Sequence, residues 1–266
     1  MALKYLILRC FIYPILGYIG DIAVRSYWVL NIAGIIAGFL VLLYNLKPLP
    51  KEYRSRVLLF AVLIFIPFIF ASRLGYIIEG LLNHDKDFSL SFFGPVSFWW
   101  GFIFAALCCV PFAKLLKTGF WKTADLLSFS IATGGVFAKL GCLFNGCCIG
   151  LRAPKNFFFG TFYSPYSYAY TVFGDLPLYP VQLFESFAWL LILIILFIRK
   201  KYVVYNGELI ILAAFCYSIA RFVLEFFRYH EVPHLISGGQ LFSILIFIVS
   251  SLLWIFKKSV LKKGQL

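Results

Sequence analysis

Four ionisable side chains, Arg73, Glu185, Arg221 and Glu225, interrupt long apolar stretches of this chain. Arg73 lies in FIPFIFASRLGYIIEG, and Arg221 and Glu225 lie in LAAFCYSIARFVLEFFR. A charge at the depth of a lipid bilayer is costly, so it normally faces a partner or a polar cavity. The sequence therefore predicts a polar site inside a bundle of membrane helices.

The last of these stretches places polar side chains on one helical face. Tyr217, Arg221, Glu225 and Arg228 follow one another at helical spacing, so they form a single stripe. Arg221 and Glu225 can pair along it as a structural tie between helices, or they can serve a functional site. The cost of burying them, and the nearby Tyr217, favour function.

Arg73 carries a planar fork of donors that suits a phosphate group. Two buried arginines on different helices exceed the needs of one local ion pair, so they indicate a bound anion, most plausibly the phosphate of a phospholipid. The alternative is that Arg73 pairs with a helix carboxylate. Gln182 and Glu185, three residues apart after Pro180 at a helix start, can bind a polar group or brace the helix, and both interpretations remain open.

The segment GCLFNGCCIGLR combines Cys142, Cys147 and Cys148 with glycines that allow close approach of the backbone. A disulfide suits an oxidising outer face. A reactive thiol is a second interpretation, with Lys139 lowering its pKa, and buried packing is a third. Because C-x-x-C pairs are absent and the chain has only 3 histidines, a metal site is less well supported. We expect neither a metal nor a cofactor.

The elements that position these residues follow from composition. The chain is 62% hydrophobic and 13% charged, with a mean hydropathy of +0.93, which excludes an ordinary soluble domain. We predict an all-α polytopic membrane bundle that forms a single domain over residues 1–266. Seven apolar segments predict about seven transmembrane helices, at 27–44, 57–82, 96–113, 124–141, 181–198, 207–227 and 237–256.

Charge predicts the topology. The net charge is +13, but the basic residues cluster in alternate short loops, which indicates contact with anionic lipid rather than with nucleic acid. By the positive-inside rule, the N-terminus lies outside and the C-terminus in the cytoplasm. The first 20 residues faintly resemble a signal peptide without a convincing cleavage site, so we expect them to be retained. The aromatic-rich outer loop at about 142–180 is interpreted as an interfacial cap or gate, or as a plain loop.

Six short stretches occur in an order that resembles the prolipoprotein diacylglyceryl transferase family, from about residue 22 to about 245. They are VRSYW, SRLGYII, FAKLGCLFNGCCIG, YPVQLFE, YSIARFVLEFFR and ISGGQLFS. The resemblance implies a bacterial inner-membrane transferase whose site opens to the outer side. Such enzymes move the diacylglyceryl group of phosphatidylglycerol to a cysteine thiol of a lipoprotein precursor and release glycerol phosphate. Preorganised donors would stabilise the departing phosphate and a base would form the thiolate.

The resemblance also suggests roles for individual residues. Together with the reasoning above, it assigns catalysis to Arg73, Arg221, Tyr217, Cys142 and Cys147. It assigns substrate binding to Tyr27, Lys139, Asn145, Gly146, Gln182, Glu185, Glu225 and Arg228.

The departures from the family pattern concern the base and the acceptor. Trp99 stands in SFWWG where the family has a catalytic histidine, and indole cannot accept a proton. Lys139, Cys142, Cys147 and Tyr179 replace arginine, asparagine, glutamate and histidine of the family motifs. The acceptor is therefore a lipoprotein cysteine or a small or lipidic molecule.

The missing histidine leaves open both the identity of the base and the function of the protein. Cys142, Cys147, Tyr27 or Tyr217 could supply the base or the nucleophile, including through a covalent cysteine intermediate. The alternative function is a non-catalytic phospholipid-binding or translocating relative, and a transporter or channel is the least supported class.

Overall fold

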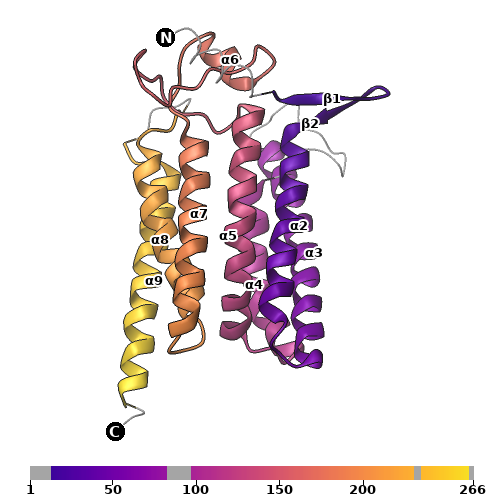
Figure 1. The fold of residues 1–266 in the computed structure, drawn as a ribbon, viewed down its shortest axis with the longest axis vertical. Helices are drawn as coiled ribbons and strands as arrows, with labels where there is room; N and C mark the ends of the chain where they lie inside the picture. Colours follow the sequence, from indigo (N-terminus) through magenta and orange to yellow (C-terminus); the bar gives the residue numbers. More distant parts are fainter. Residues whose placement is uncertain (1–12, 83–96, 231–234, 264–266) are drawn as a thin grey trace. The chain divides into compact units, whose positions relative to one another are not determined.

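The computed structural model describes residues 13–82, 97–230 and 235–263, and this part of the chain is predominantly helical (Figure 1). Each of the seven apolar segments predicted from the sequence coincides over most of its length with a helix. The long helices are α2 Ser26–Leu46, α3 Lys51–Leu82, α4 Phe98–Leu115, α5 Phe120–Asn145, α7 Val181–Arg199, α8 Glu208–Glu225 and α9 Gly238–Lys263. A short helix, α6 Tyr168–Phe173, and a 3-10 turn, η1 Lys200–Tyr202, complete the helical elements.

Among the described residues, five helices are long and apolar enough to cross a membrane: α2, α3, α5, α7 and α9. The apolar part of α4, Trp100–Leu115, is shorter. Helix α8 is not among these five, because it carries three charged residues, Glu208, Arg221 and Glu225, within its 18 residues. A helical membrane protein is therefore confirmed, whereas seven spans and their orientation remain predictions.

A β-hairpin before α2 was not predicted from the sequence. Strands β1 (Ile15–Ile19) and β2 (Ile22–Arg25) form an antiparallel hairpin directly before α2. Gly20, with φ 59°, lies in the tight turn between them, a position that favours glycine. The strands were overlooked because their apolar residues continue the hydrophobic N-terminal stretch, part of which falls outside the described residues.

The chain divides into two compact units, and the boundaries fall inside α2 and α5. The unit of residues 45–127 contains the packed pair α3 and α4. A Cβ at Gly75 would lie 2.1 Å from Cγ of Trp100, and one at Gly101 would lie 1.8 Å from Oγ of Ser72. These glycines therefore permit the close helix contact that is common in membrane proteins.

The other unit contains residues up to 44 and from 128 onward. Helices α7, α8 and α9 pack in sequence order as neighbours (Figure 1). Phe129 and Ala132 of α5, Ile192 and Leu196 of α7, and Leu209 of α8 belong to one buried apolar cluster. This cluster fixes α5, α7 and α8, which carry most of the polar side chains discussed below.

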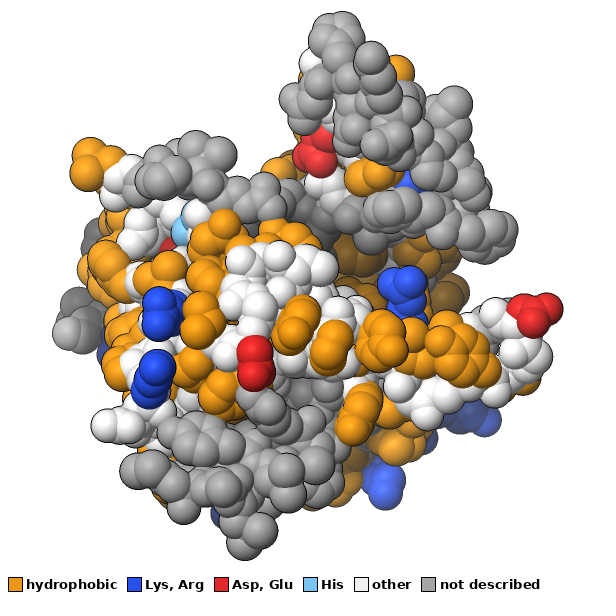
Figure 2. All heavy atoms as spheres, turned by 90° about the horizontal axis from the view of Figure 1, so that it is seen from above, with side chains coloured by type: hydrophobic (Ala, Val, Ile, Leu, Met, Phe, Trp, Pro, Cys, Tyr) orange, Lys and Arg blue, Asp and Glu red, His pale blue; other side chains and the backbone are white. Residues whose placement is uncertain are grey.

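The segment between α5 and α7 folds back over the start of α7. Its first part is held by backbone hydrogen bonds from Leu151 N–H to Phe227 O (2.8 Å) and from Tyr229 N–H to Ile149 O (3.0 Å). The same segment exposes the aromatic side chains of Phe158, Phe159, Tyr166 and Tyr168. Hydrophobic side chains are prominent on the face seen from above (Figure 2). Aromatic side chains at this density suit the headgroup level of a membrane. The role of this loop as an interfacial cap or gate remains a prediction.

Candidate active site

Glu185, in the second turn of α7, is the centre of a buried ionic cluster. Its side chain is 1% exposed. Lys139 Nζ of α5 lies 2.7 Å from Oε2, Arg221 Nη1 of α8 lies 2.5 Å from Oε1, and Arg228 Nη1 lies 3.7 Å from Oε1. Cations from three segments therefore converge on one carboxylate.

Glu225, at the end of α8, is the second carboxylate. Its Oε2 lies 2.8 Å from Arg221 Nη2, and its Oε1 accepts a hydrogen bond from Ser237 Oγ (2.8 Å). His230 Nε2 lies 3.2 Å from the same oxygen. A Cβ at Gly239 would lie 2.4 Å from Glu225 Oε1, so the glycine leaves room for the carboxylate.

The predicted stripe on α8 is partly wrong. The helix was expected to reach residue 227, but it ends at Glu225, so Arg228 lies in the turn beyond it. Arg228 nevertheless faces Glu185, because the backbone at Gly150 pairs with the backbone at Arg228 and holds the turn in place.

These five groups do not balance in charge. Lys139, Arg221 and Arg228 are cations, while Glu185 and Glu225 are the two carboxylates. The cluster therefore carries an excess positive charge in a buried environment, where electrostatic interactions are strong. Such a site is suited to a phosphate group.

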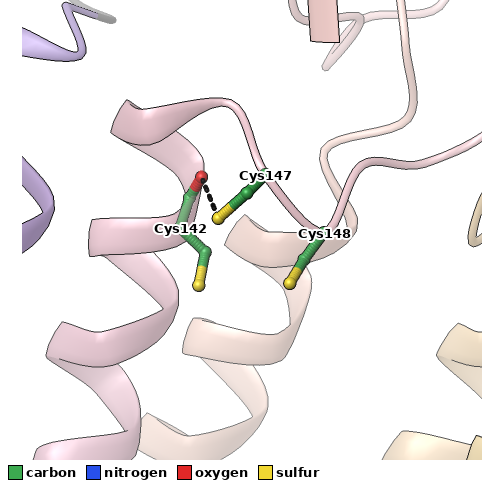
Figure 3. A group of neighbouring side chains, drawn as sticks. All are labelled: Cys142, Cys147 and Cys148. Atoms are coloured by element: carbon green, nitrogen blue, oxygen red, sulfur yellow. Dashed lines mark hydrogen bonds between the residues drawn. The ribbon is translucent and has the colours of Figure 1, made fainter. Parts of the chain in front are cut away.

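The thiols approach one another because of the way α5 ends. Gly146 has φ 68°, its N–H donates to Leu143 O (3.2 Å), and Cys147 N–H donates to Cys142 O (3.2 Å). These bonds define a Schellman motif, which brings the side chain four residues before its glycine next to the one directly after it. Here those side chains are Cys142 and Cys147, and Cys147 Sγ also donates to Cys142 O at 3.8 Å (Figure 3).

Cys148 completes a cluster of three thiols. It is a non-glycine residue with φ 56°, a left-handed conformation that costs roughly 1–2 kcal/mol. The three Sγ atoms all lie within 4.8 Å of one another, and all three cysteines are free thiols (Figure 3). The turn at Gly146 therefore gives these cysteines the proximity that a C-x-x-C pair would give, although the sequence contains no such pair, and the expected absence of a metal stays a prediction.

The thiol cluster adjoins the ionic cluster. Hydrogen bonds from Cys142 and Cys147 lower the pKa of the Cys148 thiol; burial opposes this, and the charges of Arg228 and Lys139 lower the pKa further. The cysteine loop and the cations therefore belong to one site.

Gln182, in the first turn of α7, is fully buried and uses both ends of its amide. Its Nε2 donates to Cys147 O (2.8 Å), and its Oε1 accepts from Tyr163 Oη (3.2 Å). Burial raises the pKa of Tyr163, although the hydrogen bond with Gln182 opposes the shift. Of the two roles left open for Gln182, the contacts favour bracing. Asn145 also hydrogen-bonds Cys147 through its side chain.

The two tyrosines predicted for the site lie beside these clusters. The Tyr217 ring stacks on Trp189, with the ring centroids 4.3 Å apart, and it is close enough to Lys139 and Glu185 to interact with their charges. Tyr27 on α2 lies near Cys142 and interacts with it electrostatically.

Arg73 and Trp99 belong to the unit of residues 45–127. Arg73 is 3% exposed on α3, and its guanidinium lies 5.1 Å from the Tyr76 ring centroid. Its participation beside Arg221 remains a prediction. Trp99 lies on α4, and its side chain is outside the described part of the structure, so the loss of the histidine remains an argument from sequence.

The sequence analysis missed two contacts of Glu225. His230 was not singled out, because it lies beyond the helix and follows no periodic pattern. Ser237 appeared only in the closing stretch of the resemblance, and nothing in its spacing indicated a bond to Glu225. Cys148 was noted but not assigned a role.

Known proteins resemble this chain in sequence over most of its length. The sequence model of the family described as prolipoprotein diacylglyceryl transferase matches residues 14–256. The phosphatidylglycerol–prolipoprotein diacylglyceryl transferase of Shouchella clausii is 25% identical over 248 residues, which cover 90% of this chain and 88% of the relative. The enzymes of the same name from Helicobacter hepaticus and Campylobacter curvus are 27% and 34% identical, over 92% and 67% of this chain and 89% and 64% of their own lengths. The chain belongs to the prolipoprotein diacylglyceryl transferase family.

Proposed function

We propose that this protein transfers the diacylglyceryl group of phosphatidylglycerol to an acceptor thiol. The observation that carries the proposal is the buried ionic cluster around Glu185, whose excess positive charge suits the phosphate of the donor. The names of the relatives supply the donor and the reaction. The site opens to the outer side of a bacterial inner membrane crossed by seven helices, an orientation supported by the alternation of basic loops.

The chemical step is a displacement at carbon. The acceptor sulfur attacks the glyceryl carbon that bears the phosphate ester, the carbon–sulfur bond forms, and the carbon–oxygen bond breaks. Its electron pair goes to the phosphate oxygen, and glycerol phosphate leaves. Arg221, Lys139 and Arg228 stabilise the charge on the leaving group, and Glu185 fixes their positions.

His230 is the proton acceptor of this proposal. Its imidazole is 35% exposed and lies 3.2 Å from Glu225, a carboxylate that can orient the ring. It supplies the base that indole at Trp99 cannot provide. The covalent cysteine intermediate is disfavoured, because a diacylglyceryl thioether on the protein is a stable bond and its sulfur a poor leaving group.

The acceptor is a cysteine thiol of a lipoprotein precursor, as the names of the relatives indicate. A small or lipidic acceptor is the second candidate, favoured by the replacement of the family asparagine and glutamate by Cys142 and Cys147. Both share the need for a nucleophile beside the ionic cluster.

The proposal is tested with purified protein in phosphatidylglycerol vesicles and a cysteine-containing precursor peptide, with the products identified by mass spectrometry. We expect a diacylglyceryl thioether on the peptide and free glycerol phosphate. Arg221→Gln should reduce product formation by more than about 100-fold. Arg199→Gln is the matched control, because Arg199 also pairs with a buried glutamate, Glu208, but at the opposite end of α7.

The outcomes separate the functions. Product with thiol peptide and with no other nucleophile supports the proposal. Bound phosphatidylglycerol without turnover, with any peptide or lipid acceptor, would instead identify a non-catalytic phospholipid-binding relative. Equal activity of Arg221→Gln and Arg199→Gln would show that the ionic cluster is structural.

A further inference from the structure

The three thiols at the end of α5 have the arrangement of a metal-ligand set. We propose that Cys142, Cys147 and Cys148 bind a soft metal ion, Zn²⁺ in the first place, through three thiolates, and that the fourth position receives the sulfur of the acceptor. The Sγ atoms lie within 4.8 Å of one another. Zinc–sulfur bonds of about 2.3 Å at tetrahedral angles place sulfurs about 3.8 Å apart. Closing the cluster onto an ion therefore needs movements of about 1 Å or less.

The backbone builds this cluster independently of any ion. The Schellman bonds at Gly146 fix Cys147 over Cys142, and the amide of Gln182 holds Cys147 O at 2.8 Å. Cys148 adopts a left-handed conformation at φ 56°. Cysteines that merely fill apolar space, such as Cys108 and Cys109 within α4, need no such turn.

A disulfide explains the arrangement less well. Across a trans peptide, the Cα atoms of Cys147 and Cys148 lie about 3.8 Å apart, below the range of about 4.4–6.8 Å that disulfides use. A disulfide from Cys142 to either Cys147 or Cys148 would leave the remaining thiol without a role. Three mutually adjacent sulfurs are instead typical of a thiolate site, and thiolates select Zn²⁺ or Cu⁺ over harder ions.

The charged surroundings favour the bound form. Lys139 and Arg228 are close enough to Cys148 to interact with it electrostatically. Three thiolates around Zn²⁺ carry one net negative charge, which these two cations stabilise. A zinc site with three protein ligands keeps one position open, as zinc sites that act on a substrate do.

The role of the open position rests on the proposed function. A thiol that coordinates zinc is deprotonated outright. The acceptor thiol would lose its proton to His230 on binding, its sulfur would then form the bond to the glyceryl carbon, and the phosphate ester oxygen would leave with the electron pair. The ion is neither oxidised nor reduced. The metal would thus keep the sulfur of the acceptor deprotonated, as a thiolate. Other members of the family activate that sulfur without these cysteines.

Metal binding is measured first, on full-length protein purified anaerobically in detergent. We expect about one zinc per chain by elemental mass spectrometry, and thiolate-to-metal charge-transfer absorption when Co²⁺ replaces it. Cys148→Ser should lose both signals. Cys142→Asn, which introduces the residue type of the family motif at this position, should lose both signals as well. The double variant Cys108→Ser/Cys109→Ser should keep both. Folded wild-type protein without zinc and without the Co²⁺ signal would overturn the proposal, as would a disulfide between any two of the three cysteines.

The open position is tested in the Co²⁺ protein without any phospholipid. A cysteine peptide should add a fourth thiolate and change the visible spectrum, whereas the same peptide with serine should not. An unchanged spectrum with saturating cysteine peptide would overturn the acceptor role. Since neither measurement requires turnover, metal and thiol binding without transfer activity would refute the proposed function and leave the metal site standing.

Discussion

Glu185→Gln tests whether one buried carboxylate organises the cations of the site. The substitution keeps the shape of the side chain but removes the negative charge that faces Lys139 at 2.7 Å, Arg221 at 2.5 Å and Arg228 at 3.7 Å. Removing one partner of a buried ion pair costs about 3–5 kcal/mol, because the remaining charges stay desolvated. We expect the free energy of unfolding to fall by about 3 kcal/mol, at the lower end because Glu225 still neutralises part of the charge.

The catalytic effect should be separable from the structural one. Without Glu185 the cations repel one another and move from the positions that stabilise the leaving phosphate, so kcat should fall about 100-fold, equivalent to about 2.7 kcal/mol. The KM for phosphatidylglycerol should stay the same or decrease, because the cations remain available for the donor phosphate. The assay is initial-rate kinetics in mixed micelles at several mole fractions of the donor, alongside thermal unfolding in detergent.

Glu208→Gln is the matched control. Glu208 is also 1% exposed, pairs with Arg199, and accepts a hydrogen bond from Val204 N–H at 2.8 Å. Arg199 lies 14 positions beyond Glu185 on α7, about 21 Å along the axis. We expect a smaller stability loss of about 1–2 kcal/mol, since Arg199 is 35% exposed and can be hydrated, and an unchanged kcat. A wild-type kcat in folded Glu185→Gln, or equal losses of kcat in both variants, would refute the positioning role.

Three further substitutions test the site locally. Gly146→Ala should lower the free energy of unfolding by about 2–3 kcal/mol in thermal melts, because φ is 68° and the new Cβ would lie 2.6 Å from a serine side chain. Gly119→Ala, with φ 77° and nothing within 4 Å of the new Cβ, should cost only the backbone strain of about 1–2 kcal/mol. Gly239→Ala should reduce the transfer rate at least about tenfold by displacing the carboxylate 2.4 Å away, whereas its neighbour Gly238→Ala, with nothing within 4 Å, should not. His230→Ala should lower kcat by about 100-fold or more, and added imidazole should restore part of the rate; full activity without imidazole would remove the residue from the mechanism.

The buried ionic residues could be predicted because charged residues are rare in sequence segments that are apolar enough to lie in a membrane. Arg221 and Glu225 stand four residues apart in an apolar helix, so both their burial and their mutual contact follow from helical spacing. That Glu185 would also meet Lys139 could not be derived, because it depends on how α5, α7 and α8 pack. The contacts of Glu225 with His230 and Ser237 could not be predicted either, because both residues lie in irregular segments whose sequence has no periodic pattern.

The fold was predictable where apolar length decides the structure. The seven long helices follow the hydrophobic segments, whereas the hairpin of β1 and β2 does not, because a short apolar strand pair cannot be distinguished from the start of a helix by hydropathy. Helix ends were the weakest point. The residues between Glu225 and Arg228 look helical in their pattern, yet the helix stops, and the chain turns to pair with the segment at Gly150.

The turn at Gly146 makes the chemistry of this site open to change by point substitution. Backbone hydrogen bonds and one left-handed glycine, rather than the side chains themselves, bring positions 142 and 147 together. Other side chains at these two positions, such as asparagine and glutamate, would be held equally close by the same turn. Side chains of different chemistry, such as an amide, a carboxylate or a thiol, can therefore replace one another at positions 142 and 147 one residue at a time, without rebuilding the scaffold and without moving the cations around Glu185.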